Sequence, residues 1–536
     1  MAAHACAPVD PTPRGRVVSA PVTPARGSRR ALAVVLLLVA AIVGGVLAGR
    51  SHAPGGSKPV APVDAAQVPA AGALSTAWYC PGLPPSFPTA DQSVTLTNLG
   101  SNPAEVIATV YPDNGSAAVA RSFVIGRESV MTLDRSTLQV RAKSTPTTTT
   151  TTSTTATSTT AAGGTAKSGV PDGPLVVEPF SSDVMVSAGL ESADALATVP
   201  CATTTATDWY FAAGTTVRGA SQWLVLDDPF AADARVDITL RTDAGVQVLP
   251  SLTGLDVPGR ARVIIPIQNE AVRRARVSVE VHASVGRVVA SQTLQFGSAS
   301  GPQGVATSIG AVAPSSAWWF TDGDTRTGAV NVVAIADVGE LDARVNVQAQ
   351  DGTKAIVRPV SLTVPSGGVS WVQIGGCATA KLTCLAVPDR VGFVLLVQSD
   401  AGAPIVAQTL TRLDGDRGTT LGAATSIGAV TPSTRWVIPR TRATGQSSTS
   451  IALTDTGVNS AHVSIEFVHG GRVDQPAALR RVTIKPGVRF VVPLADDPAL
   501  QHVDAAVVVT SDVPIFAEWT IYAAHDATRA FGIPSR

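Results

Sequence analysis

The sequence predicts an all-β protein, with an N-terminal transmembrane helix followed by about four immunoglobulin-like β-sandwich repeats in tandem. Residues 306–312 and 424–430 both read ATSIGAV, and each copy continues through a proline and two small hydroxyl residues to a tryptophan. The spacing of 118 residues is too long for a solenoid unit or a single propeller blade. It fits tandem β-sandwich modules of roughly 100 residues each.

A strand with alternating apolar and polar residues recurs in every proposed repeat. In the stretch ARVDITL, we expect Val236, Ile238 and Leu240 to face the core while the intervening polar residues face solvent. Comparable stretches begin at residues 104, 343 and 461. Little helical periodicity follows residue 50, so two-layer antiparallel sandwiches are the predicted architecture.

Turn residues follow the alternating strand in a shared order. Three repeats have a turn with Pro and Gly, and each repeat then has two further strands joined by Ser with Asp, Gly or Pro. We expect both features to close β-hairpins. The tryptophan strand near the start of each repeat either opens its own repeat or completes the preceding one.

The predicted organisation has seven parts. They are a basic Pro-rich tail (1–30), a transmembrane helix (31–49), a flexible Pro/Ala/Gly stalk (50–74) and four repeats (75–203, 204–304, 305–422 and 423–536). The first repeat contains a Thr-rich insertion, 144–170, with almost nothing to bury, so we expect it to be disordered. It is a tolerated loop insertion, an O-glycosylated tract, or both.

The apolar segment 31–49 decides the predicted location. It contains no charged residue, and 19 helical residues span about 28 Å, close to the hydrocarbon thickness of a bilayer. Five arginines and one aspartate precede it, so the positive-inside rule places 1–30 in the cytoplasm and the rest outside the cell membrane. A signal peptide cleaved after Ala48 is the alternative, and it also exports the chain. Arg50 stands where a lipoprotein signal requires cysteine, which excludes lipidation there.

Four cysteines follow the apolar segment, an even number in a compartment that permits disulfides. Cys377 and Cys384 are close enough in sequence to close one loop, which leaves Cys80 to pair with Cys201 across the first repeat. A bridge over so long a loop stabilises by about 4 kcal/mol in the chain-entropy description. The alternative is four free thiols, whereas zinc is not expected because no CxxC pair or suitably spaced histidine is present.

Charge and motifs exclude several function classes. The 40 basic and 40 acidic residues cancel, which removes the basic footprint of a nucleic-acid binder. No GxSxG, HExxH, SxxK, P-loop or GxGxxG motif is present, so we predict no catalytic, cofactor-binding or metal-binding residues and no enzymatic activity. Asp322-Gly323-Asp324 and Asp414-Gly415-Asp416 resemble DxD metal motifs, but we expect ordinary turns there because calcium requires six or more oxygen ligands.

Tryptophans recur near the start of each repeat. A tryptophan can fill a sandwich end or a seam between domains, or it can offer a stacking face to a sugar ring. The candidate seam or glycan contacts are Trp78, Trp209, Trp318, Trp319 and Trp436.

The short motifs AWYCPG at 77–82 and Pro-Cys at 200–201, together with the overall layout, resemble those of an uncharacterised actinobacterial family of single-pass, membrane-anchored envelope proteins, classed as a domain of unknown function. The resemblance implies a place beside cell-surface glycan assembly and no particular mechanism. We therefore predict a membrane-anchored, extracytoplasmic structural or interaction protein, an accessory of the cell envelope, with the membrane and envelope proteins or glycans as partners. The alternative is a glycan-binding or glycan-processing protein that uses exposed Trp and Asp side chains.

Overall fold

The computed structural model describes residues 76–84, 86–87, 92–134, 138, 172–192, 195–297, 303–326, 328–380, 382–414, 421–442, 447–492, 494 and 504–535. The predicted tail, transmembrane helix, stalk and Thr-rich insertion all lie outside these residues. The chain divides into two units, Met1–Ala61 and Pro62–Arg536, and only the second contains described residues. Within that described part, no helix has the length and apolar character needed to span a bilayer.

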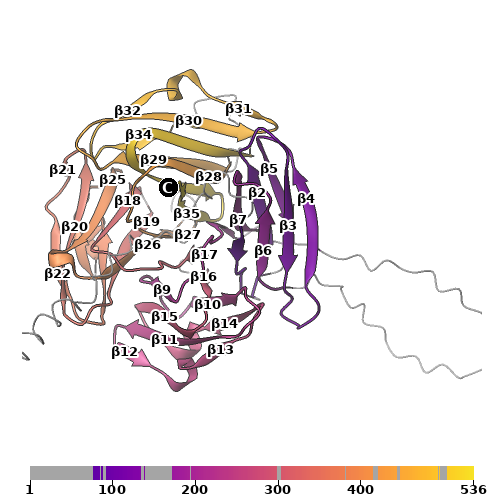
Figure 1. The fold of residues 1–536 in the computed structure, drawn as a ribbon. Helices are drawn as coiled ribbons and strands as arrows, with labels where there is room; N and C mark the ends of the chain where they lie inside the picture. Colours follow the sequence, from indigo (N-terminus) through magenta and orange to yellow (C-terminus); the bar gives the residue numbers. More distant parts are fainter. Residues whose placement is uncertain are drawn as a thin grey trace, which may run out of the picture. The chain divides into compact units, whose positions relative to one another are not determined.

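The described fold is all-β, which confirms the predicted class, and its strands form four successive modules (Figure 1). Module 1 contains β1 (Trp78–Cys80), β2 (Gln92–Asn98), β3 (Ala104–Val110), β4 (Val119–Ile125), β5 (Ser129–Asp134), β6 (Leu175–Pro179), β7 (Val184–Glu191) and β8 (Leu196–Pro200). Module 2 contains β9 (Asp208–Phe211), β10 (Ala220–Asp228), β11 (Ala234–Thr242), β12 (Gly245–Val248), β13 (Leu255–Val257), β14 (Ala261–Pro266), β15 (Val277–Val285), β16 (Val289–Gly297) and β17 (Gln303–Ile309), with a short helix α2 (Ile267–Glu270).

Modules 3 and 4 repeat this order of strands. Module 3 contains β18 (Ala317–Asp324), β19 (Ala329–Asp337), β20 (Ala343–Asp351), β21 (Lys354–Ala355), β22 (Val360–Val364), β23 (Val369–Ile374), β24 (Thr383–Leu385), β25 (Gly392–Ser399), β26 (Ile405–Asp414) and β27 (Leu421–Ile427). Module 4 contains β28 (Ser433–Arg442), β29 (Ser447–Asp455), β30 (Ala461–His469), β31 (Arg472–Asp474), β32 (Val482–Ile484), β33 (Arg489–Val491), β34 (Asp504–Ala523), β35 (Ala527–Phe531) and β36 (Ile533–Pro534). Short 3-10 turns are η3 (Pro250–Leu252), η4 (Cys377–Thr379), η5 (Asp400–Gly402) and η7 (Ala477–Leu479).

Modules 1 to 3 each consist of two sheets, whereas the strands of module 4 form one continuous sheet folded into two layers, and each module has a buried apolar cluster between its layers. In module 1 the sheets have the orders β1-β6-β3-β4 and β5-β2-β7-β8, and modules 2 and 3 repeat these pairings with small additions. In module 4 one long strand, β34, belongs to both layers: it pairs with β28 and β30 through its first half and with β29 and β35 through its second. The alternating strand faces the core as its pattern predicts, since Val236, Ile238 and Leu240 are all buried.

The turns with Pro and Gly do not close hairpins, contrary to the prediction. In module 2, β13 pairs with β11 in one sheet, whereas β14, which follows the turn, pairs with β10 in the other. The next predicted hairpin also crosses between layers, because β15 pairs with β11 and β16 with β10. A hairpin and an arch between two sheets both need a tight reversal, so the same turn residues serve either, and only the packing of the two layers decides between them.

The opening tryptophan strand belongs to its own module. It pairs with β6 in module 1 and with β15, β25 and β34 in the others. The indole N–H of Trp209 donates to the Val288 carbonyl at 2.9 Å, that of Trp318 to Ile405 at 2.9 Å and that of Trp436 to Ile515 at 2.7 Å. Each acceptor lies where the chain crosses from one sheet to the other, so the tryptophan satisfies a carbonyl of that arch from inside the module.

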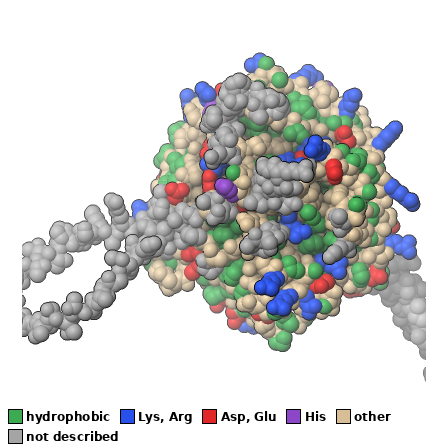
Figure 2. Space-filling model, turned by 180° about the vertical axis from the view of Figure 1, so that it is seen from behind, with side chains coloured by type: hydrophobic (Ala, Val, Ile, Leu, Met, Phe, Trp, Pro, Cys, Tyr) green, Lys and Arg blue, Asp and Glu red, His purple; other side chains and the backbone are tan. Residues whose placement is uncertain are grey.

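The surface carries both signs of charge. On the face drawn in Figure 2, basic, acidic and apolar side chains are interspersed wherever the surface is not grey. This mixing agrees with the equal numbers of basic and acidic residues in the sequence.

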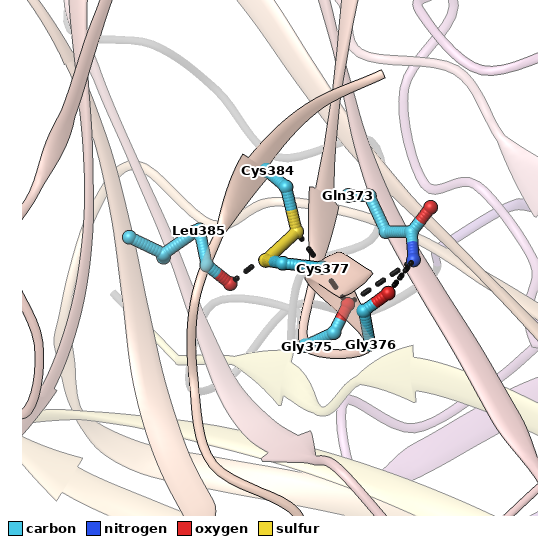
Figure 3. Close-up of a disulfide and its surroundings, with 6 residues drawn as sticks. All are labelled: Gln373, Gly375, Gly376, Cys377, Cys384 and Leu385. Carbon is cyan, nitrogen blue, oxygen red and sulfur yellow. Dashed lines mark hydrogen bonds between the residues drawn. A yellow bond between two sulfur atoms is a disulfide. The ribbon is translucent and has the colours of Figure 1, made fainter. Parts of the chain in front are cut away.

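Both predicted cysteine pairs form disulfides in the structure. Cys377 and Cys384 close the loop after β23, with Cα atoms 5.6 Å apart. Gln373 Nε2 donates to the carbonyls of Gly375 and Gly376, at 3.1 and 3.3 Å, beside the bridge (Figure 3). These contacts fix a loop that otherwise contains little regular structure.

The second bridge, Cys80–Cys201, has a counterpart without cysteine in modules 2 and 3. Backbone hydrogen bonds join Tyr79 to Ala202, and the same bonds join Trp319 to Ala429, so Phe320 and Gly428 occupy the positions of Cys80 and Cys201. A Cβ on Gly428 would lie 2.7 Å from Cζ of Phe320. The aromatic ring therefore fills the space over a glycine, which explains the glycine of the ATSIGAV motif. Phe211 and Gly310 repeat the arrangement in module 2.

This equivalence predicts that a disulfide can be moved between modules. In the double variant Phe320→Cys/Gly428→Cys, we expect a disulfide to form in module 3, because the two backbones face each other as those of Cys80 and Cys201 do, with Cα atoms 4.9 Å apart. Peptide mapping by mass spectrometry without reduction measures it. The single variant Phe320→Cys serves as control and keeps a free thiol, whereas two free thiols in the double variant would contradict the equivalence.

Candidate functional site

Four strands, one from each module, meet at a common axis. They are β8, β17, β27 and β35; β17 and β35 each contact both β8 and β27, and β17, β27 and β35 are labelled at the centre of Figure 1. Glycine permits the close approach, because a Cβ on Gly304 or Gly422 would lie 2.4 Å from Oδ1 of Asp526. Both glycines also have positive φ, at 109° and 140°, a backbone conformation that other residues rarely adopt.

A single carboxylate joins these four strands. Oδ2 of Asp526 accepts the backbone N–H groups of Leu196 at 3.0 Å and Val305 at 2.8 Å. Oδ1 accepts those of Ala423 at 2.9 Å and Ala527 at 2.8 Å. The four donors come from the four different modules and occupy the same position in each, six residues before the residue that pairs with the opening strand.

Asp526 is buried, with an exposed fraction of 1%. Burial raises the pKa of its carboxyl to about 7, while the four N–H donors act in the opposite direction and favour the ionised form. Each donor would otherwise be an unsatisfied buried polar group. Sequence analysis missed this residue because it recurs nowhere: the equivalent positions in the other modules are Ala195, Gly304 and Gly422.

Modules 1 and 2 are joined by a buried arginine. The guanidinium of Arg262 donates to Asp113 at 2.8 Å, pairs with Asp172 at 2.9 Å, and reaches the carbonyls of Pro81 and Leu83 at 2.9 and 3.1 Å. Its side chain is fully buried. All the partners belong to module 1, so this one side chain from β14 fixes the seam between the two modules.

Modules 3 and 4 share a buried network of charges that includes Asp322. The Asp322 carboxylate pairs with Arg489, and Thr520 Oγ1 donates to it at 2.5 Å. Burial alone would raise the pKa of Asp322, but the charges of Arg489 and Arg529 hold it below its ordinary value. Glu518 Oε2 accepts the N–H groups of Thr321 and Asp322, at 2.7 and 2.8 Å.

The first DxD motif is therefore not a turn, contrary to the prediction. Asp322, Gly323 and Asp324 lie within β18, and Asp324 pairs with Arg326 at 2.7 Å. Among the described residues, no group of three or more His, Cys, Asp or Glu side chains is placed to hold a metal ion. In the second motif, Gly415 and Asp416 lie outside the described residues, as does the side chain of Asp414.

The two remaining seams close the cycle. Between modules 2 and 3, Gln408 Oε1 accepts the N–H of Ala213 at 2.9 Å, and Gln408 Nε2 donates to Ser308 Oγ at 3.2 Å. Between modules 4 and 1, Thr97 Oγ1 donates to the Pro439 carbonyl at 2.7 Å. The first module thus contacts the last, which the tandem pattern in the sequence does not indicate.

An apolar cavity of about 120 Å³ lies where the four axial strands end, beyond the end that holds Asp526. One residue from each module lines the cavity at the equivalent position, directly before Cys201, Gly310, Gly428 or Gly532. These four residues, which we call the axial ring, are Pro200, Ile309, Ile427 and Phe531. The ATSIGAV copies supply two of them, and Trp318 and Trp436 complete the wall.

The structure places four of the five candidate tryptophans inside single modules and the fifth, Trp319, at the seam between modules 3 and 4. Trp78, Trp209, Trp318 and Trp436 are 0–2% exposed and each lies in the apolar core of its own module. Trp319 is half-buried, and its ring stacks on Phe516 with centroids 5.9 Å apart.

One further buried carboxyl, Asp227 on β10, has no hydrogen-bond partner for either oxygen among the described residues. It is 1% exposed. Burial raises the pKa of Asp227 to about 8, against the lowering effect of Arg262. We therefore expect the carboxyl to carry its proton in the folded protein at neutral pH.

Comparison with known proteins identifies one family. A family model described as "Family of unknown function (DUF5719)" matches residues 155–429, just over half of the chain. No curated protein matches the sequence. A solved structure described as "Biofilm associated protein - BSP domain" aligns with 89% of this chain and 99% of its own, at 8% identity and a TM-score of 0.12. A TM-score this low does not show a shared fold.

The role of Asp526 predicts a large loss of stability on its removal. Asp526→Ala leaves four buried N–H groups without an acceptor, and each such group costs about 1–3 kcal/mol. We expect a lower free energy of unfolding and faster proteolysis between modules. Asp342→Ala, at an exposed aspartate that accepts one N–H from Ser366 at 2.9 Å, is the matched control. Equal stability of the two variants would contradict the role.

Asp227 predicts a specific dependence of stability on pH. Its pKa is about 8 in the folded protein against an ordinary value of 3.8, so between these values the folded state holds a proton that the unfolded state has lost. The free energy of unfolding therefore falls as pH rises through this window, by at most about 1.4 kcal/mol per pH unit from this group. Asp227→Asn should remove that slope in urea denaturation between pH 5 and pH 8, chosen here as roughly the interior of the window. Asp256→Asn, at an exposed position, should leave the slope in place; a slope that persists in Asp227→Asn refutes the assignment.

Proposed function

We propose that this chain, which belongs to the DUF5719 family of unknown function, is an exported, membrane-anchored structural or interaction protein of the cell envelope with no catalytic activity of its own. The observation that carries the proposal is the single Asp526 carboxylate that accepts N–H groups from all four modules. These hydrogen bonds hold the four β-modules in a fixed arrangement, whereas unconnected modules would move independently. A fixed body with several loop-bearing ends suits interaction more than chemistry.

The use of the buried charges supports the non-catalytic part of the proposal. Asp322, Arg262 and Arg489 have strongly buried side chains, and buried ionisable groups often mark an active site. Here, however, their partners lie across the seams between modules. These buried charged groups therefore stabilise the contacts between modules.

We also propose that the modules are immunoglobulin-like, and their strand order supports this. In module 1 the second strand pairs with the fifth and the third with the sixth, in two facing antiparallel sheets. Crossing connections of this kind, with about eight strands in a module of roughly 100 residues, are typical of immunoglobulin-like sandwiches. Modules 2 and 3 share the same pairings.

Two features support export and anchoring. The structure contains two disulfides, and disulfides persist in oxidising compartments. The segment 31–49 is long and apolar enough to cross a bilayer as a helix, and it follows an arginine-rich tail. In the proposed arrangement, 1–30 is cytoplasmic and the four modules lie outside.

The topology is tested with Cys6, which lies in the proposed cytoplasmic tail. In the full-length protein, we expect a membrane-impermeant maleimide to modify Cys6 only after the membrane is opened, because the positive-inside rule keeps the tail inside. Mass spectrometry of the labelled protein gives the result. As control, a cysteine introduced at exposed Val458 (Val458→Cys) should be labelled in intact cells. Labelling of Cys6 from outside, or a mature protein that begins after Ala48, rules out the anchored topology.

A further inference from the structure

We infer that the axial cavity is a binding site for one small uncharged apolar group, either an aromatic ring or a branched aliphatic group of similar size. The inference does not depend on the membrane anchor or on the cellular location. It rests on how the cavity is built, on the chemistry of its wall and on its size.

The cavity is built by the same position of all four modules. Each member of the axial ring stands directly before Cys201, Gly310, Gly428 or Gly532 at the end of an axial strand. Ile309, Ile427 and Phe531 are only partly buried, although they lie at the convergence of four modules, whereas the residues one step further along the chain are buried. The three apolar side chains thus border space that the protein itself leaves unfilled.

The wall offers apolar surface and no free charge. Among the described residues that line the cavity, Arg529 is the only charged one. Its guanidinium is buried and donates to Thr520 at 2.9 Å and to Thr411 at 3.2 Å. The indole N–H groups of Trp318 and Trp436 are also engaged, with carbonyls of their own modules. A charged ligand would therefore lose its hydration without gaining a partner.

An aromatic group borders one side of the cavity. Phe531 lies 6.2 Å from Trp436 and 6.4 Å from Phe516 between ring centroids, with the rings tilted to one another. A further ring placed against Phe531 would extend this cluster, and such contacts add to the gain from buried area.

The size sets the ligand class. The cavity measures about 120 Å³, whereas an apolar cavity of about 150 Å³ in another protein stays dry and binds benzene or xenon. One ring or a short branched chain fits, and a nucleotide or a sugar chain does not. An empty apolar cavity lacks contacts on its inner side, so a ligand that fills it restores dispersion contacts that the wall otherwise forgoes.

Calorimetric titration of the full-length protein with benzene tests the inference. We expect saturable binding and a rise in the melting temperature with benzene concentration. Benzoate, which has the same ring with a charge, should not bind. N-acetylphenylalanine amide distinguishes the source of the group: if it binds, the cavity admits a side chain presented by a partner, and if only benzene binds, the cavity takes free small molecules.

Two variants link any binding to the axial ring. Ile427→Trp fills the cavity and should weaken benzene binding at least ten-fold, while Val458→Trp, at an exposed position, should not change it. Should Ile427→Trp fail to fold, Ile427→Ala enlarges the cavity and should admit naphthalene, which the wild type excludes. The inference is overturned if the wild type shows no saturable binding of benzene, or if folded Ile427→Trp binds it as well as the wild type does.

Discussion

The Asp526 carboxylate is the interaction on which the arrangement of the four modules depends. An axis on which four strands meet side by side leaves backbone N–H groups that no neighbouring strand can accept, because the strands belong to different sheets. A buried unsatisfied N–H is costly, so each must find an acceptor. One carboxylate has enough lone pairs for all four. The carboxylate fits on the axis because Gly304 and Gly422 have no side chain that would collide with it.

That solution explains why the modules share a plan and differ in detail. Only one module can supply the carboxylate, so the equivalent position must be small in the others. Modules 2 and 3 have identical ATSIGAV segments. Module 1 uses a disulfide where they use phenylalanine over glycine, and module 4 has Arg529 and Phe531 on its axial strand.

Local features of the fold could be predicted from the sequence, and long-range ones could not. Alternation placed Val236, Ile238 and Leu240 correctly because the period of a strand is a local property. The spacing of the cysteines led to both bridges in the structure. The turn residues predict hairpins where the structure has arches, because a turn residue does not reveal which sheet the next strand joins. Asp322 resembled a turn residue because its partners, Arg489 and Thr520, lie far along the chain. Asp526 carried no signal at all, since a residue that acts once for four modules cannot appear as a repeat.

The place of Asp526 in the fourth module has a consequence for assembly. Modules 1 to 3 each contain a core of their own and can collapse as they emerge, but their axial N–H groups have no acceptor until the last module arrives. Closure of the cycle therefore comes after synthesis of nearly the whole chain, and it joins Leu196 to Asp526, which are 330 residues apart. Contacts of such high order form slowly and leave strand edges open in the meantime. The folding chain thus passes through a stage in which modules 1 to 3 have formed and their axial N–H groups still lack an acceptor.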